Sequence, residues 1–381
     1  METRISTNKD KEMLKELWAN SFNYTEQFLD WYFDNVFTPE NTLITTEFSN
    51  PIFSVSIIPQ KLTVSGQEVN SAYISGIAIP PEHRNEENMK NHISATISAA
   101  AQKGYLLSTI IPTNYKFYEK YGWRVCYNYK QYDIAPSDLP EYQVRGSFVR
   151  AKITDTSITA LSDIYADFTA SKNAYAKRSA ENWRLILEDL FSNFGGKCVV
   201  FKNQNDIPTG YILYIIRDRK MGIYEFCYKD RTAYESLIGF INAHKLNIES
   251  VAIKASADDL SHLDFCDRRD AVRLYPFAAA RITNAKDALE PFAAACTESF
   301  KLQIIDRLIE ENNQTFLISD GEVSRTEEPA DVITDIGTLT QLFMGYISAE
   351  EARRMNLISG NSAYLDKMFC KKNNYINMLL T

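Results

Sequence analysis

A strand that breaks sharply into a helix is the part of the sequence best suited to chemistry. Residues 73–79 are rich in β-forming side chains, and Pro80 and Pro81 stop the strand because proline cannot donate to a β-ladder. From Met89 onward apolar side chains recur at helical spacing, and Gly104 follows where a helix C-terminus favours glycine. The start of such a helix offers free backbone N–H groups and the positive end of a dipole. The pattern therefore indicates a site for an anion such as a diphosphate.

A second strand and a short helix must hold this site in place. Residues 105–111 form a short apolar run of the buried-strand type, which Pro112 closes. Thr113 or Asn114 can cap a last short helix that ends at Gly122. Together with the first strand and helix, these segments predict a βαβ unit that is followed by a short helix.

The two stretches resemble a known family. Residues 77–89, followed by the block Phe-Tyr-Glu-Lys-Tyr-Gly-Trp at 117–123, resemble the acetyl-CoA core of the GNAT acetyltransferases. The chain looks most like the enhanced-intracellular-survival type, whose C-terminal part is similar to sterol carrier protein type 2. The resemblance spans nearly the whole chain. It implies an acetyl-CoA-dependent N-acetyltransferase that acts on an amine of a small molecule or peptide, and it implies a homo-oligomer.

The resemblance also implies the residues of an active site. Tyr118 stands where the family places its proton donor, and the C-terminal carboxylate, which belongs to Thr381 here, would act as the base. A backbone N–H of the strand at 77–79 would face the thioester carbonyl. The residues implied to bind acetyl-CoA are Ile77, Ala78, Ile79, Arg84, Asn85, Glu86, Glu87, Asn88, Met89, Lys90, Thr113 and Asn114.

The chain departs from the family at the phosphate loop. The family reads Arg-x-x-Gly-x-Gly or a variant, whereas this chain keeps Arg84, has Glu87 and Met89 at the glycine positions, and adds a further acid at Glu86. A carboxylate beside a diphosphate costs roughly 1 kcal/mol per charge pair at 4 Å in water, and about 4 kcal/mol at an effective dielectric constant of 20. Alternatively, Glu86 and Glu87 have no part in ligand binding and only stabilise the positive end of the helix dipole. The alternative hypothesis is therefore a non-catalytic binding or scaffold protein on the same fold with a degenerate loop.

Composition argues against several other classes of function. The chain has 381 residues, of which 45% are apolar, and a formal net charge of −8. An acidic chain is a poor nucleic-acid binder, because phosphate neutralisation needs clustered Lys and Arg. The six cysteines contain no C-x-x-C pair and the four histidines show no metal spacing, so we expect no metal site. The N-terminus is polar and no apolar run is long enough for a membrane span, so we expect a cytoplasmic protein.

The remaining patterns predict an α+β fold of two tandem GNAT-like mixed-sheet domains followed by a sterol-carrier-like α+β domain. Strands at 210–216 and 223–228, a helix at 232–245 and a strand at 250–255 repeat the order of the first unit. No glycine loop stands at 229–231, so we read this second copy as one that carries no cofactor. The expected domain boundaries are 1–136, 137–275 and 276–381.

Overall fold

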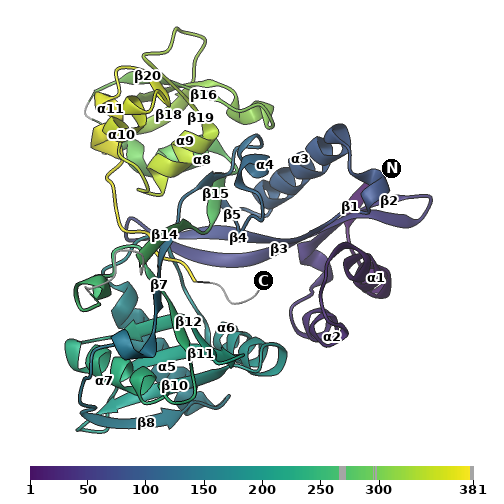
Figure 1. Ribbon diagram of the computed structural model, residues 1–381. Helices are drawn as coiled ribbons and strands as arrows, with labels where there is room; N and C mark the ends of the chain where they lie inside the picture. Colours follow the sequence, from purple (N-terminus) through teal and green to yellow (C-terminus); the bar gives the residue numbers. More distant parts are fainter. Residues whose placement is uncertain (266–271, 295, 297, 378–381) are drawn as a thin grey trace. The chain divides into compact units, whose positions relative to one another are not determined.

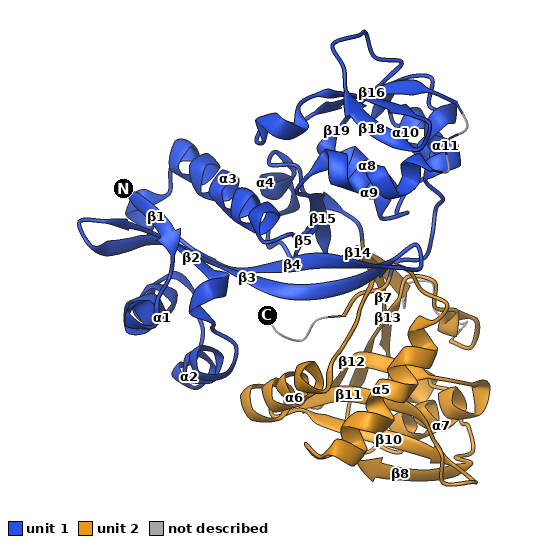
Figure 2. Cartoon of the chain, turned by 180° about the vertical axis from the view of Figure 1, so that it is seen from behind, with its two compact units in different colours: residues 1–126, 277–374 blue, residues 127–276, 375–381 orange. Residues whose placement is uncertain are grey.

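The computed structural model describes residues 1–265, 272–294, 296 and 298–377. The chain divides into two units, each of which combines separate stretches of sequence (Figure 2). Unit 1 comprises residues 1–126 and 277–374, and unit 2 comprises residues 127–276 and 375–381. Among the described helices, none is long and apolar enough to cross a membrane.

Unit 1 contains a mixed sheet that is covered by helices on both faces. Its strands follow the order β1 (Glu2–Ile5), β2 (Thr42–Glu47), β3 (Asn50–Val64), β4 (Gln67–Ala78), β5 (Leu107–Ile110), β15 (Ala279–Ile282) and β6 (Arg124–Val125). Helices α1 (Lys11–Ser21) and α2 (Glu26–Asn35) lie on one face, and α3 (Glu86–Gln102) lies on the other (Figure 1). Successive side chains of a strand point to opposite faces, so Leu43 packs with α3 while Ile44 packs with α1 and α2.

The C-terminal part of unit 1 forms a second, smaller sheet. Its strands follow the order β18 (Glu322–Arg325), β17 (Thr315–Ser319), β16 (Phe300–Ile305), β19 (Val332–Asp335) and β20 (Ile358–Gly360). Its helices are α8 (Ala285–Ala293), α9 (Ile336–Phe343), α10 (Ala349–Arg354) and α11 (Ala363–Met368). A capping box opens α10, in which the Ser348 hydroxyl accepts from the Glu351 N–H and the Glu351 carboxylate accepts from the Ser348 N–H.

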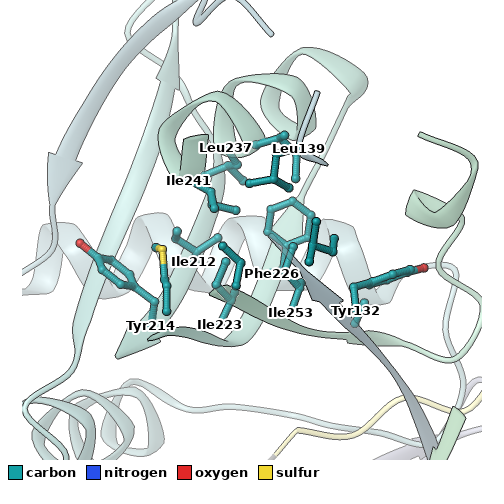
Figure 3. Close-up of a cluster of buried hydrophobic side chains, with 14 of the residues drawn as sticks. Tyr132, Leu139, Ile212, Tyr214, Ile223, Phe226, Leu237, Ile241 and Ile253 are labelled. Carbon is teal, nitrogen blue, oxygen red and sulfur yellow. The ribbon is translucent and has the colours of Figure 1, made fainter. Parts of the chain in front are cut away.

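Unit 2 repeats the arrangement of a mixed sheet between helices. Its strands follow the order β14 (Val272–Pro276), β7 (Asn128–Ile134), β13 (Ser250–Ser256), β12 (Lys220–Tyr228), β11 (Pro208–Arg217), β10 (Lys197–Asn203) and β8 (Gly146–Arg150). Its helices are α5 (Asp155–Thr169), α6 (Ala180–Glu188) and α7 (Arg231–Asn242). Leu237 and Ile241 of α7 pack on Ile212, Ile223 and Ile253 of the sheet (Figure 3). The expected α+β fold class is confirmed, including the second strand-helix-strand unit.

Two strands join sheets that the expected boundaries did not assign to them. The boundary at 136 placed residues 128–134 in the first domain, but as β7 they pair with β13 and β14 in unit 2. The boundary at 275 placed residues 279–282 in the C-terminal domain, but as β15 they pair with β5 and β6 in unit 1. Strand patterns identify a strand but not its partner, because pairing depends on which sheet edge is open when the chain returns.

A buried histidine belongs to the core between α3 and the sheet. His92 is 4% exposed and stacks on Phe53 with 4.2 Å between ring centroids. Its Nδ1 lies 3.3 Å from the Thr45 hydroxyl oxygen, and its buried Nε2 has no hydrogen-bond partner among the described residues. Burial lowers the pKa of His92 to about 4, so the ring is neutral at pH 7.

Replacing His92 by Phe is expected to make the protein less sensitive to acid. Between about pH 6.5 and pH 4 the unfolded chain binds a proton at His92 that the folded chain does not, so stability falls as pH falls, by roughly 3 kcal/mol at most. Urea unfolding across this pH window measures the loss, which should be smaller in His92→Phe than in the wild type. His244→Phe, at a less buried histidine that follows α7 in unit 2, should keep the wild-type pH dependence. Equal pH dependence in wild type and His92→Phe would contradict the assignment.

Candidate active site

The end of the parallel ladder between β4 and β5 opens a pocket in unit 1. The two strands pair only from Ser71 opposite Leu107 to Tyr73 opposite Thr109, and β4 then continues to Ala78 without β5 beside it. A pocket of about 330 Å³ lies beyond this point, between the end of β4, the start of α3 and α4 (Tyr115–Glu119). The pocket thus lies at the carboxyl ends of two neighbouring parallel strands, where ligands commonly bind in α/β sheets.

A β-bulge shapes the β4 wall of the pocket. Ser54 of β3 pairs with Ala78, whereas Ser56 pairs with Ser75, so β4 holds one extra residue between these pairs. Gly76 within the bulge has a φ of +62°, and a Cβ there would lie 1.9 Å from the Trp18 ring. Glycine is required both by the left-handed backbone and by the indole. A bulge leaves one residue outside the ladder, and Ile77 beside it lines the pocket.

The second wall of the pocket is formed by Arg84 and Met89, before and within the start of α3. Some of the polar groups in this region are already hydrogen-bonded within the chain. The Asn85 carboxamide oxygen caps the helix by accepting from the Asn88 N–H at 2.8 Å. The Arg84 Nε donates to the Ile79 carbonyl oxygen at 2.9 Å, which ties the loop to the end of β4. The exposed Glu86 carboxylate lies 3.1 Å from the Lys120 ammonium, so one of the two first-turn acids is paired with a cation.

Tyr118 on α4 places a phenol in the pocket. Its ring packs edge-on against Phe117 and Trp123, with centroid distances of 5.0 and 6.0 Å. Burial raises its pKa, so the hydroxyl is protonated at pH 7. No described residue forms a hydrogen bond with this hydroxyl, which leaves it available to donate a proton to a ligand.

The pocket brings together some of the residues that the sequence predicted and leaves others aside. The predicted residues that line it are Ile77, Ile79, Arg84, Met89, Thr113, Asn114 and Tyr118. Asn85, Glu86, Glu87, Asn88 and Lys90 lie in the first turns of α3 without lining it, and Ala78 is buried in the cluster with α1 and α2. Thr381 lies outside the described residues.

Sequence reasoning missed the wall that α1 contributes. Ser21 and Phe22 at the end of α1 line the pocket, as does Phe117, which is part of the recognised block but had no assigned role. Phe22 packs edge-on against Trp18 at 5.4 Å. Nothing in the local pattern around Phe22 distinguishes it from a core aromatic. Among the described residues, no group of His, Cys, Asp and Glu side chains is arranged to hold a metal ion.

Three parts of the chain match known domain families. Residues 2–126 match an acetyltransferase (GNAT) domain family, residues 174–282 match a second acetyltransferase (GNAT) domain family, and residues 279–377 match a sterol carrier protein domain family. The expected composition of two GNAT domains followed by a sterol-carrier-like domain is confirmed, as is the resemblance to the enhanced-intracellular-survival type. No curated protein matches the sequence significantly.

Solved structures with the same fold cover nearly the whole chain. A protein of unknown function from Enterococcus faecalis V583, described as a probable N-acyltransferase, is 22% identical with a TM-score of 0.84, covering 99% of each chain. A GCN5-related N-acetyltransferase from Anabaena variabilis ATCC 29413 is 17% identical with a TM-score of 0.82, covering 98% of each chain. Eis1 from Mycobacterium abscessus is 16% identical with a TM-score of 0.73, covering 99% of this chain and 98% of its own.

Proposed function

We propose that this chain, in which two GNAT domains precede a sterol carrier protein domain, transfers an acetyl group from acetyl-CoA to an amine in the pocket between β4 and β5. The observation that carries the proposal is that Ile77 beside the β4 bulge, Met89 near the start of α3 and Tyr118 of α4 line this one pocket. The GNAT matches support acyl-CoA-dependent transfer as the class of reaction. The acceptor is an amine of a small molecule or a peptide.

Each part of the pocket has a role in such a transfer. The amine nitrogen bonds to the thioester carbonyl carbon and the carbon–sulfur bond breaks, which requires a base for the amine proton, a donor for the oxyanion and an acid for the thiolate. We assign the donor to the backbone N–H beside Ile77 and the acid to Tyr118. The base is assigned to the C-terminal carboxylate of Thr381 on the resemblance alone.

The start of α3 and Arg84 are assigned to the diphosphate of CoA. Amides in a first helical turn have no acceptor within the helix, which leaves the N–H groups of Glu86 and Glu87 for a ligand. Arg84 adds a cation at the pocket, and Lys120 offsets the charge of Glu86. The Asn88 N–H is already taken by the Asn85 cap, so this helix start offers fewer free donors than a glycine loop would.

The wild-type protein is expected to bind acetyl-CoA in the micromolar range, with a free energy of about −8 kcal/mol in calorimetric titration. A Glu86→Gln, Glu87→Gln variant should bind more tightly by about fivefold, because about 1 kcal/mol of repulsion from Glu87 disappears, whereas the charge of Glu86 is already paired with Lys120. Glu82→Gln removes an exposed acid that lies before the helix, so its affinity should equal that of the wild type.

The capped and acidic start of α3 favours one alternative function. A chain that has lost its phosphate loop would act as a non-catalytic binding or scaffold protein on the same fold. That alternative predicts no acetyl-CoA binding by the wild type, with binding recovered when Glu86 and Glu87 are both replaced by Gly. The titration that tests the proposal therefore also distinguishes the two functions.

A further inference from the structure

The second GNAT domain has the same kind of opening between two parallel strands as the first, but side chains of the protein fill this second opening. β12 pairs in parallel with β13 only from Lys220 opposite Ser250 to Ile223 opposite Ile253, and β12 then continues to Tyr228. The space beyond this point is lined by Tyr224, Lys254 and Ser256 together with Tyr375–Asn377 from the C-terminal end. Only about 10 Å³ remains open there, compared with about 330 Å³ in the pocket of the first domain.

Asn377 is held through both its side chain and its backbone. Its Nδ2 donates to the Tyr224 carbonyl oxygen at 2.9 Å and to the Glu225 Oε1 at 3.1 Å. Its backbone oxygen accepts from the Arg178 Nη2 at 2.9 Å, and its Oδ1 accepts from the Lys254 Nζ at 3.4 Å. The carboxamide therefore donates hydrogen bonds through its Nδ2 and accepts one through its Oδ1. A carboxylate of similar size could not make the donated bonds, because it has no N–H.

Tyr375 makes a second polar contact to the same carboxylate. Its hydroxyl donates to the Glu225 Oε1 at 3.0 Å, and its N–H donates to the Asn173 carbonyl oxygen at 2.9 Å. Its ring packs edge-on against Phe168 with 5.3 Å between centroids. The segment is thus bound by an aromatic contact and by hydrogen bonds to groups of unit 2.

Glu225 is a buried carboxylate that accepts hydrogen bonds from Tyr375 and Asn377. The residue is 1% exposed, and its carboxylate accepts from Arg178 at 2.8 Å through each oxygen and from the Tyr211 hydroxyl at 2.9 Å. Arg178 in turn lies over the rings of Tyr165 and Trp183 at 4.1 and 4.6 Å. Because a buried carboxylate is costly unless its oxygens are fully hydrogen-bonded, the donors of Tyr375 and Asn377 complete a site that the domain cannot complete alone.

We infer that the opening between β12 and β13 is a binding site for the chain's own C-terminal segment, residues Tyr375–Asn377, and that Glu225 and Arg178 recognise it. The segment occupies the place in the second GNAT domain that the open pocket occupies in the first. The second domain then serves to hold the end of the chain, and its opening has no room for a thioester. This inference does not depend on the proposed acetyl transfer.

Carboxypeptidase digestion of the full chain, followed by intact mass, tests the inference. In the wild type we expect trimming to halt before Asn377, because this residue is 4% exposed and is held by hydrogen bonds to its backbone oxygen and from its side-chain Nδ2. In Asn377→Ala the loss of residues 375–377 should be at least tenfold faster. Asn373→Ala changes the same residue type at an exposed position and should behave as the wild type. Equally fast trimming of wild type and Asn377→Ala, or equal resistance of both, would overturn the inference.

A second variant separates recognition by Glu225 from general packing. Tyr375→Phe keeps the ring in its aromatic contacts and removes only the hydroxyl that donates to Glu225. Hydrogen exchange should then be at least tenfold faster at the amides of 375–377, with exchange in α7 unchanged. Hydrogen exchange in Tyr375→Phe tests the inference even if Asn377→Ala fails to fold. Unchanged exchange in Tyr375→Phe would show that Glu225 does not recognise the segment.

Discussion

Replacing Tyr118 by Phe is expected to lower kcat for acetyl transfer by about 100-fold or more, which corresponds to about 3 kcal/mol of transition-state stabilisation. Among the described residues that line the pocket, Tyr118 alone carries a phenol and none carries a side-chain carboxyl group. Burial raises its pKa, so it carries its proton at pH 7 and can donate it to the leaving thiolate. Phe keeps the edge-on contacts with Phe117 and Trp123, so the fold should be unaffected.

The measurement is the steady-state release of free thiol from acetyl-CoA in the presence of an amine acceptor. We expect kcat to fall while the calorimetric affinity for acetyl-CoA stays within about twofold, since the removed interaction acts in the transition state. Tyr121→Phe, at a buried tyrosine that does not line the pocket, is the matched control and should keep wild-type kcat. A Tyr118→Phe enzyme with full kcat would mean that the proton comes from another group.

Replacing Arg178 by Met should destabilise unit 2 by about 3–5 kcal/mol, because it leaves the Glu225 carboxylate buried without its cation. The pair is buried, with side-chain exposures of 4% for Arg178 and 0% for Glu225. Burial by itself raises the pKa of Glu225, but the attraction and hydrogen bonds of Arg178, together with the hydrogen bonds from Tyr211 and Asn377, bring the pKa below its usual range. Without Arg178, the side chains that donate hydrogen bonds to this carboxylate among the described residues are the neutral Tyr211, Tyr375 and Asn377.

Urea unfolding followed by hydrogen exchange at the amides of α6 and β12 reports on this region, because α6 carries Trp183 beside the Arg178 guanidinium and β12 carries Glu225. Adding Glu225→Gln to Arg178→Met removes the unpaired charge and should recover more than half of the lost stability. Arg184→Met is the matched control, because its ion pair with Asp155 is exposed and should contribute about 0.5 kcal/mol or less. A loss of less than about 1 kcal/mol in Arg178→Met would contradict the prediction.

Local sequence patterns determined the elements of the first GNAT domain. The two prolines after β4, the Asn85 cap of α3 and the Asn114 cap of α4 each act on backbone groups a few residues away. The Asn114 side chain accepts from the Phe117 N–H at 3.1 Å, as the capping pattern predicted. Local interactions of this kind are visible in the sequence because both partners lie within one turn.

Only the tertiary structure decided which distant segments meet. It placed β7 in the sheet of unit 2 and β15 beside β5 in unit 1, brought Phe22 at the end of α1 to the pocket beside Tyr118, and placed Tyr375 against Glu225, 150 residues away in sequence. A buried carboxylate takes its donors from whichever segment reaches it, so no short pattern around Glu225 identifies them. The sequence by itself therefore determined the fold family and the candidate proton donor, while the walls of the pocket and the position of the C-terminal segment depend on packing between residues far apart in the chain.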